Sequence, residues 1–118
     1  MTKLAGSGSV GPSKPSSPPI PLDDIQAPMI ASMFKALGEP VRLRLLTMIA
    51  AGGETCVCDL SQAFHLTGPT ISYHLKVLRD AGLVGCQRRG TWVYYWVVPT
   101  AMHRLAGCLV SAVPDSGK

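Results

Sequence analysis

Hydrophobic positions repeat with helical spacing in four stretches of the chain, beginning at Ile25. Apolar side chains recur every three or four residues over about 25–37 and again over about 41–51. A short third helix is expected over about 57–64, and a fourth over about 69–81. Residues that commonly begin or end helices mark the boundaries: Gly38, Pro40, Gly52, Gly53, Pro69 and Gly82. The pattern therefore predicts four successive helices.

After the fourth helix, the spacing of apolar residues changes from helical to alternating. Two β-rich runs, 83–88 and 91–98, flank Arg89-Gly90 and predict a hairpin. A final helix is expected over about 100–110. Two short helices joined by a tight turn and followed by a hairpin are typical of a winged helix-turn-helix. We therefore expect an α+β, mainly helical fold over residues 23–111: four helices, a β-hairpin wing and a C-terminal helix.

The two ends of the chain have a different composition. Residues 1–22 are rich in proline, serine and glycine, which predicts a disordered tail, and a short flexible tail is expected over 112–118. No apolar segment is typical of a secretory signal, and no apolar run is long enough to cross a bilayer. Four cysteines are too few for a disulfide scaffold. A cytoplasmic protein with no membrane partner is the expectation.

Basic residues are concentrated in the fourth helix and the hairpin. The chain has a net charge of +4, and residues 67–98 contain four basic residues against Asp80 alone. Polar residues on the outer face of the fourth helix are candidates for reading base edges in the major groove: Thr70, Ser72, Tyr73 and His74. Lys76 and Arg79 are candidate phosphate contacts, and Arg88 and Arg89 at the hairpin tip are expected against the backbone or in the minor groove. A solvated, charged surface is the alternative for any single residue, but the joint pattern favours double-stranded DNA.

Cys56 and Cys58 form a Cys-x-Cys pair at the start of the third helix. Two thiolates suit a soft, thiophilic ion, and the helix dipole is expected to lower a thiol pKa. Residues i and i+2 do not share a helix face, so both sulfurs are expected to reach one ion only if the first turn is irregular or unwinds. The alternative is two partly buried small apolar residues. Cys86 and Cys108 are expected in a strand and in the last helix, packed in the core.

Three segments resemble the ArsR/SmtB family of metal-sensing repressors: Phe34–Leu46, Pro69–Val84 and Arg88–Tyr95. The resemblance covers about residues 25–110. It implies a homodimer joined through the first and last helices that binds an imperfect inverted repeat. Apolar stripes at Ile30-Met33-Phe34-Leu37 and Met102-Leu105-Leu109 are consistent with such an interface.

Glu54–Leu60 is similar to the arsenic-sensing box of arsenical-resistance repressors and to the related box of cadmium/lead sensors. The arsenic box usually has a third cysteine three residues after the second, where this chain has Ser61. Cadmium/lead sensors of this type add N-terminal cysteines from the other subunit, and none precedes Cys56 here. Cys108, Cys86 or an external thiol is therefore the candidate third ligand.

These features together predict a repressor that leaves its operator when As(III) or Sb(III) binds Cys56 and Cys58. A cadmium/lead sensor and a thiol redox-switch repressor of the same fold are alternatives, with Cd(II) or Pb(II) as ligand in the first. A constitutive DNA-binding protein with structural cysteines is a further alternative. No nucleophile–base set, phosphate loop or paired-carboxylate motif is present in the sequence, so an enzyme is not expected.

Overall fold

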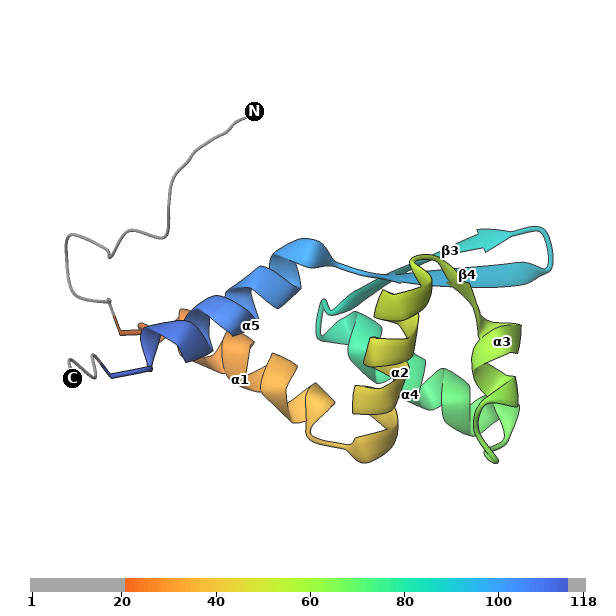
Figure 1. The fold of residues 1–118 in the computed structure, drawn as a ribbon, viewed down its shortest axis with the longest axis horizontal. Helices are drawn as coiled ribbons and strands as arrows, with labels where there is room; N and C mark the ends of the chain where they lie inside the picture. The colour runs from red at the N-terminus through yellow and green to blue at the C-terminus, as the bar shows by residue number, and fades with distance from the viewer. Residues whose placement is uncertain (1–20, 115–118) are drawn as a thin grey trace.

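The computed structural model describes residues 21–114. Most of the expected tail at 1–22 and the end of the expected tail at 112–118 lie outside these residues. The described chain forms five helices and a three-stranded antiparallel sheet (Figure 1). The helices are α1 (Gln26–Leu37), α2 (Pro40–Gly52), α3 (Val57–Gln62), α4 (Gly68–Asp80) and α5 (Pro99–Ser111). The strands are β2 (Thr55–Cys56), β3 (Val84–Arg89) and β4 (Trp92–Val97). The winged helix-turn-helix is confirmed.

Local interactions explain where the central helices begin and end. The Glu39 carboxylate accepts a hydrogen bond from the backbone N–H of Arg42 at 2.9 Å, and this caps α2. The Thr67 hydroxyl caps α4 by accepting from the N–H of Thr70 at 3.3 Å. Gly82 has a φ of 80°, so the chain can turn sharply from α4 into the hairpin without steric strain.

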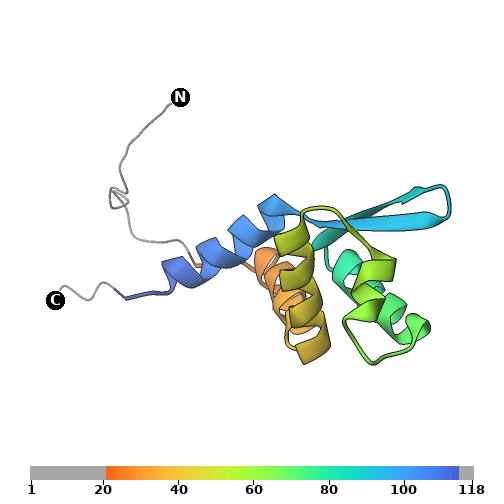
Figure 2. The same ribbon diagram turned by 45° about the vertical axis from the view of Figure 1, so that its right-hand side comes forward.

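The sheet contains one strand that the sequence pattern did not predict. β2 is only two residues long and pairs with β4, placing Thr55 opposite Tyr95 and Cys56 opposite Tyr94. The expected hairpin forms between β3 and β4, which gives the strand order β2-β4-β3. Figure 2 shows the hairpin extending away from the helices as a wing. The short strand fixes the Cys-x-Cys segment to that wing.

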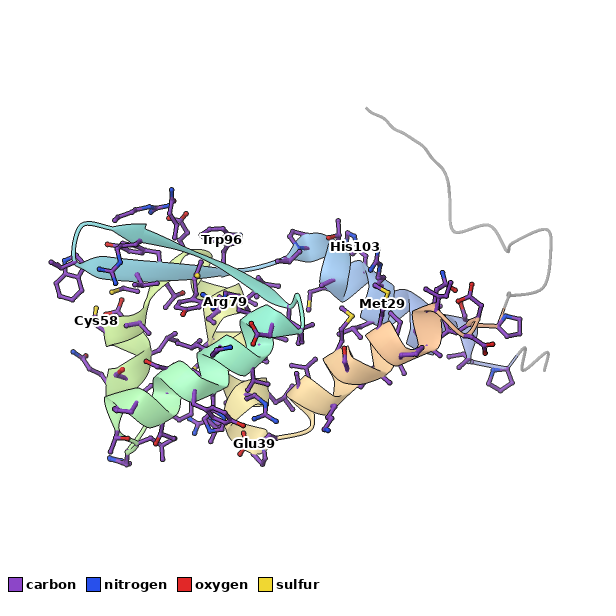
Figure 3. The ribbon with its side chains drawn as sticks, turned by 180° about the vertical axis from the view of Figure 1, so that it is seen from behind. Met29, Glu39, Cys58, Arg79, Trp96 and His103 are labelled. Atoms are coloured by element: carbon purple, nitrogen blue, oxygen red, sulfur yellow. The ribbon has the colours of Figure 1, made fainter. Side chains whose placement is uncertain are left out.

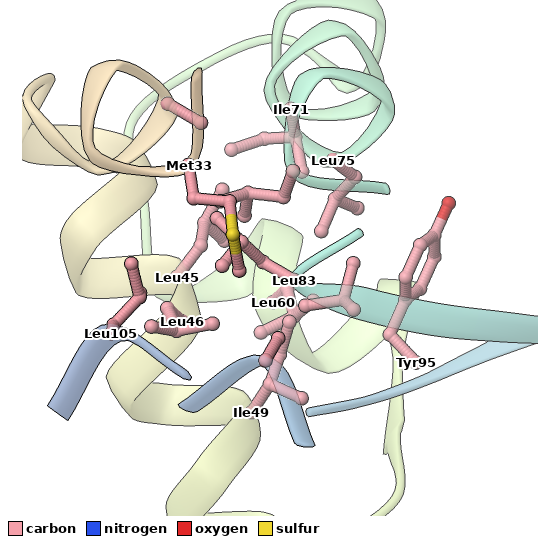
Figure 4. Close-up of a cluster of buried hydrophobic side chains, with 14 of the residues drawn as sticks. Met33, Leu45, Leu46, Ile49, Leu60, Ile71, Leu75, Leu83, Tyr95 and Leu105 are labelled. Carbon is pink, nitrogen blue, oxygen red and sulfur yellow. The ribbon is translucent and has the colours of Figure 1, made fainter. Parts of the chain in front are cut away.

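The hydrophobic core joins α4 to α2, α3 and the start of the wing (Figure 4). Its completely buried side chains are Leu45, Ile49, Leu60, Ile71, Leu75, Leu78 and Leu83. Ile30, Met33 and Leu105 also belong to this core. Their expected role in a dimer interface is therefore wrong, because they pack within the single chain. Other apolar residues of α1 and α5, such as Met29 and Leu109, remain exposed.

Candidate functional site

The sulfur atoms of Cys56 and Cys58 lie 2.7 Å apart. Cys56 is the N-cap of α3 and has an extended backbone (φ −73°, ψ 141°), whereas Cys58 lies inside the helix. The N-cap geometry folds the Cys56 side chain back over the first turn, where its sulfur also accepts from the N–H of Cys58 at 3.4 Å. The sulfurs meet because Cys56 has a non-helical backbone at the start of α3, which is the irregular first turn expected from the sequence, and the helix need not unwind. Both thiols can face one soft ion while α3 stays intact.

The expected lowering of the thiol pKa by the helix terminus is wrong for Cys58. The pKa of Cys58 is raised, chiefly because its thiol donates a hydrogen bond to the Cys56 sulfur. Burial raises the pKa further, and so do the electrostatic interactions of Cys58 with Cys56 and Asp59. Two adjacent thiols resist becoming two adjacent thiolates. Occupation of the pair by a cation therefore requires displacement of a firmly held proton.

The other two cysteines lie in different surroundings. Cys86 is half-buried on β3, and its sulfur lies 3.5 Å from the Arg79 guanidinium of α4. Cys108 is half-buried on α5 and lines an open cavity of ≈ 750 Å³ between α1 and α5. Within residues 21–114, no three His, Cys, Asp or Glu side chains are grouped to hold a metal ion. The described chain therefore offers two sulfurs at the Cys-x-Cys pair and no preformed third ligand.

The outer face of α4 carries the residues that the sequence assigned to DNA. Ser72, Tyr73 and Lys76 are exposed, whereas Thr70 and His74 are half-buried. The Thr70 hydroxyl is engaged in the helix cap, 2.9 Å from the hydroxyl of Thr67. Lys76 forms an exposed ion pair with Asp80 at 2.8 Å. The face is polar and basic, with Tyr73 as its largest exposed side chain.

His74 is connected to a residue that sequence reasoning missed. The Arg42 guanidinium lies 3.3 Å from Nδ1 of His74, and its Nε donates to the carbonyl oxygen of Ala36 at 2.6 Å. Arg42 thus joins the end of α1 and the start of α2 to the middle of α4. The sequence separation of 32 residues between Arg42 and His74 explains why no local pattern revealed the contact.

The two arginines at the wing tip have different surroundings. Arg88 is exposed, and it has no hydrogen bond or ion pair with any of the described side chains. Arg89 forms a two-pronged ion pair with Glu54, with both N–O distances at 2.7 Å. Its guanidinium also lies 4.9 Å from the centre of the Tyr94 ring. The guanidinium lowers the pKa of Glu54, chiefly through the hydrogen bond to its carboxylate. Glu54 and Tyr94 are further site residues that sequence reasoning did not single out.

Comparison with known proteins assigns this arrangement to a class of regulator. Residues 39–85 match the family model described as "Bacterial regulatory protein, arsR family". An HTH-type transcriptional regulator of Methanocaldococcus jannaschii is 43% identical over 68 residues, which are 58% of this chain and 76% of that protein. The arsenical resistance operon repressor of Bacillus subtilis is 47% identical over 62 residues, 52% of this chain and 59% of that protein. The chain therefore spans little more than half the length of that repressor.

A solved structure supports the same assignment. The homodimeric winged helix-turn-helix DNA-binding domain from Mycobacterium bovis, a possible ArsR-family regulator, has a TM-score of 0.63 and 29% identity. That similarity covers 79% of this chain and 89% of the domain. The fold and site define a winged helix-turn-helix transcriptional regulator. The chain belongs to the ArsR family of bacterial regulatory proteins.

Among the helices of residues 21–114, none combines the length and apolar character needed to span a membrane.

Proposed function

We propose that this protein is a repressor that binds operator DNA as a homodimer and is released when As(III) or Sb(III) binds Cys56 and Cys58. The observation that carries the proposal is the 2.7 Å approach of the two sulfurs at the N-terminus of α3. Cys56 is also paired with Tyr94 of the wing, so the thiols are directly joined to a DNA-binding element. The arsenical-resistance relative supports the choice of ligand.

The proposed DNA-binding domain spans residues 23–111, with α4 in the major groove. Ser72, Tyr73 and His74 are assigned to base edges, while Lys76 and Arg79 are assigned to phosphates. Thr70 lies at the start of the helix, where backbone N–H groups also favour a phosphate. Arg88 is assigned to the DNA backbone beside the wing. Because phosphate contacts release counterions, binding should weaken steeply as salt rises.

The proposed dimer uses the exposed apolar side chains of α1, α5 and their flanking segments. These side chains are Leu22, Ile25, Met29, Leu109, Val110 and Val113. Their exposure in the single chain leaves an apolar surface of the kind that marks protein–protein contacts. The homodimeric relative from Mycobacterium bovis supports this assembly. Two copies of α4 related by a twofold axis would then read an inverted repeat.

The donor set fits a trivalent, thiophilic ligand better than zinc. Structural zinc sites need four ligands, and the described residues offer only two sulfurs at this pair. As(III) accepts sulfur ligands readily and can keep an oxygen or an external thiol in its third position. Cys86 and Cys108 remain candidates for that position only through a change in structure or through the second subunit.

Serine variants test the site. The DNA probe is a duplex that the wild-type protein selects from a random library, and binding is followed by fluorescence anisotropy with and without arsenite. Cys56→Ser and Cys58→Ser should bind the duplex normally and lose the arsenite response. Cys86→Ser and Cys108→Ser are the matched controls, and either should lose the response only if it supplies a third bond.

Two further observations complete that test. Antimonite should act like arsenite, and Zn(II) should act more weakly because a fourth ligand is missing. Release by Cd(II) or Pb(II) with no effect of arsenite would support the cadmium/lead alternative. Release by peroxide alone would support a thiol redox switch. Full release by arsenite in both Cys56→Ser and Cys58→Ser would exclude this pair as the sensing site.

A further inference from the structure

The two neighbouring arginines at the wing tip lie on opposite faces of the sheet. Successive side chains of a strand alternate between faces, so Arg88 shares a face with Cys86. That face is directed toward α4, because Cys86 contacts Arg79 of that helix. Arg89 instead contacts Tyr94 on the other face. Figure 3 shows this division, with Arg79 on one side of the sheet and Trp96 on the other. Of these two arginines, only Arg88 lies on the side of the sheet that is directed toward α4.

Contacts within the protein already occupy the Arg89 guanidinium. Two of its nitrogens donate to Glu54 at 2.7 Å each, and hydrogen bonds of 3.1 and 3.0 Å reach the amide oxygen of Gln87. The Tyr94 ring covers one side of the guanidinium. A planar guanidinium held by a two-pronged carboxylate and an aromatic ring is oriented more firmly than a lysine would be. These hydrogen bonds use four of the five N–H groups of the guanidinium, so Arg89 would have to release partners to hold a phosphate with two of them.

The same contacts connect the wing to the thiol pair. Glu54 precedes Cys56 by two residues, in the loop that leads into β2. Cys56 is the cross-strand partner of Tyr94, and the Tyr94 ring lies beside Arg89. The ion pair therefore closes a ring of contacts: Glu54 to Arg89, Arg89 to Tyr94, Tyr94 to Cys56, and back along the chain. The wing is fixed to the Cys-x-Cys segment by the short β2 pairing and by this ion pair.

We propose that Glu54 and Arg89 are positioning residues that transmit the state of the Cys56–Cys58 pair to the wing, and that Arg89 is not a DNA contact. This inference rests on the proposed function of the thiol pair. The two sulfurs already lie 2.7 Å apart, so a ligand that binds between them must push them further apart. The Cys56 backbone and its loop then shift, and Glu54 moves the wing through Arg89. Arg88, on the opposite face, then leaves its phosphate. The ion pair is exposed by 43% and 48% at its two side chains, so it stabilises the fold little and serves mainly to orient the wing.

The first arm of the test measures DNA binding without any metal, using the full chain and the selected duplex. Arg88→Gln should weaken binding and reduce the slope of log affinity against log salt by about 0.9 for each lost phosphate contact. Arg89→Gln removes the same charge one residue away and should leave that slope unchanged. Glu54→Gln should also leave it unchanged, with Asp24→Asn in the turn before α1 as a charge-matched control. A reduced slope in Arg89→Gln equal to that of Arg88→Gln would overturn the assignment of Arg89.

The second arm measures how strongly arsenite weakens DNA binding in each variant. Coupling between two sites commonly amounts to about 5- to 150-fold in affinity. Glu54→Gln and Arg89→Gln should each lose most of the wild-type effect, and the double variant should lose no more than either single variant. Arg89→Lys keeps the charge but cannot form the two-pronged pair, so it should also lose most of the effect. Asp24→Asn should respond as the wild type does.

Independent readouts separate transmission from loss of the fold or of the ligand site. Each variant should keep the wild-type Tm and bind arsenite with unchanged stoichiometry at its free thiols. A full arsenite response in Glu54→Gln and Arg89→Gln would overturn the transmitting role. A wild-type protein that ignores arsenite would overturn the proposed function and the transmitting role with it, while the salt slopes would still decide whether Arg89 touches DNA.

Discussion

The Arg42 guanidinium lies 3.3 Å from Nδ1 of His74 and thereby joins α2 to the proposed recognition helix. A guanidinium can only donate hydrogen bonds, so Nδ1 of His74 is the acceptor. Arg42 therefore orients the imidazole of His74, which the proposed function assigns to a base edge.

Replacing Arg42 should weaken both the fold and the sequence preference of the protein. Arg42→Ala removes the hydrogen bond to the Ala36 carbonyl, which should lower the free energy of unfolding by about 1.5–3 kcal/mol. Urea unfolding measures this change, with Lys35→Ala, an exposed residue of α1, as the control. A loss in Lys35→Ala as large as that in Arg42→Ala would contradict the role of the bond.

The same contact predicts a shared effect on base preference. His74→Ala should reduce discrimination by roughly 1–3 kcal/mol at the base pair it reads. Arg42→Ala should relax preference at that same base pair, because His74 loses its orientation. Selection from a random duplex library checks both variants. Changes at unrelated positions of the duplex would argue against the Arg42–His74 relationship.

The raised pKa of Cys58 predicts that the affinities of two ligands depend differently on pH. Below that pKa the thiol is protonated, so Cd(II) must displace a proton, and its affinity should rise by up to about tenfold per pH unit for each proton released. Arsenous acid supplies a hydroxyl group that leaves as water with each thiol proton, so no net proton is released. Its affinity should therefore vary little over the same range. Titrations of the thiol pair between about pH 6 and 8 compare the two ligands; equal slopes would contradict this reasoning.

Gly85 should be essential to the wing. A Cβ added there would lie 2.7 Å from the Trp96 ring, so the ring of its cross-strand partner would have to move. Gly85→Ala should therefore destabilise the protein by about 1–3 kcal/mol. Gly68→Ala at the start of α4 is the matched control, because nothing lies within 4 Å of its added Cβ. Thermal unfolding measures the Tm of both variants, and equal Tm values would contradict this prediction.

Two leucines of α5 distinguish the core from the proposed dimer surface. Leu105 is only 7% exposed, so Leu105→Glu should prevent folding. Leu109 is 58% exposed, so Leu109→Glu should leave the fold intact and produce monomers that bind the duplex weakly. Sedimentation and circular dichroism measure the two properties separately. A dimeric, DNA-binding Leu109→Glu protein would exclude this surface.

The sequence by itself determined the helices, the hairpin and the position of the thiol pair. Helical spacing, prolines near helix starts and glycines near helix ends act within a few residues, so they can be recognised without a fold. The polar outer face of α4 follows from the same periodicity, because Ile71, Leu75 and Leu78 mark its buried side. The Cys-x-Cys pair at the start of α3 was likewise visible from local pattern alone.

The tertiary structure decided which of these residues act together. Helical spacing does not distinguish a core stripe from an interface stripe, so Ile30 and Leu105 were assigned to the dimer although they are buried within one chain. β2 is too short to have a recognisable alternation, and it forms because β4 offers it hydrogen-bonding partners. Arg89 and Glu54 are 35 residues apart, so only the packing of the wing against the loop before α3 could bring them together. Their pairing is invisible in the sequence because long-range contacts depend on the assembled sheet rather than on local spacing.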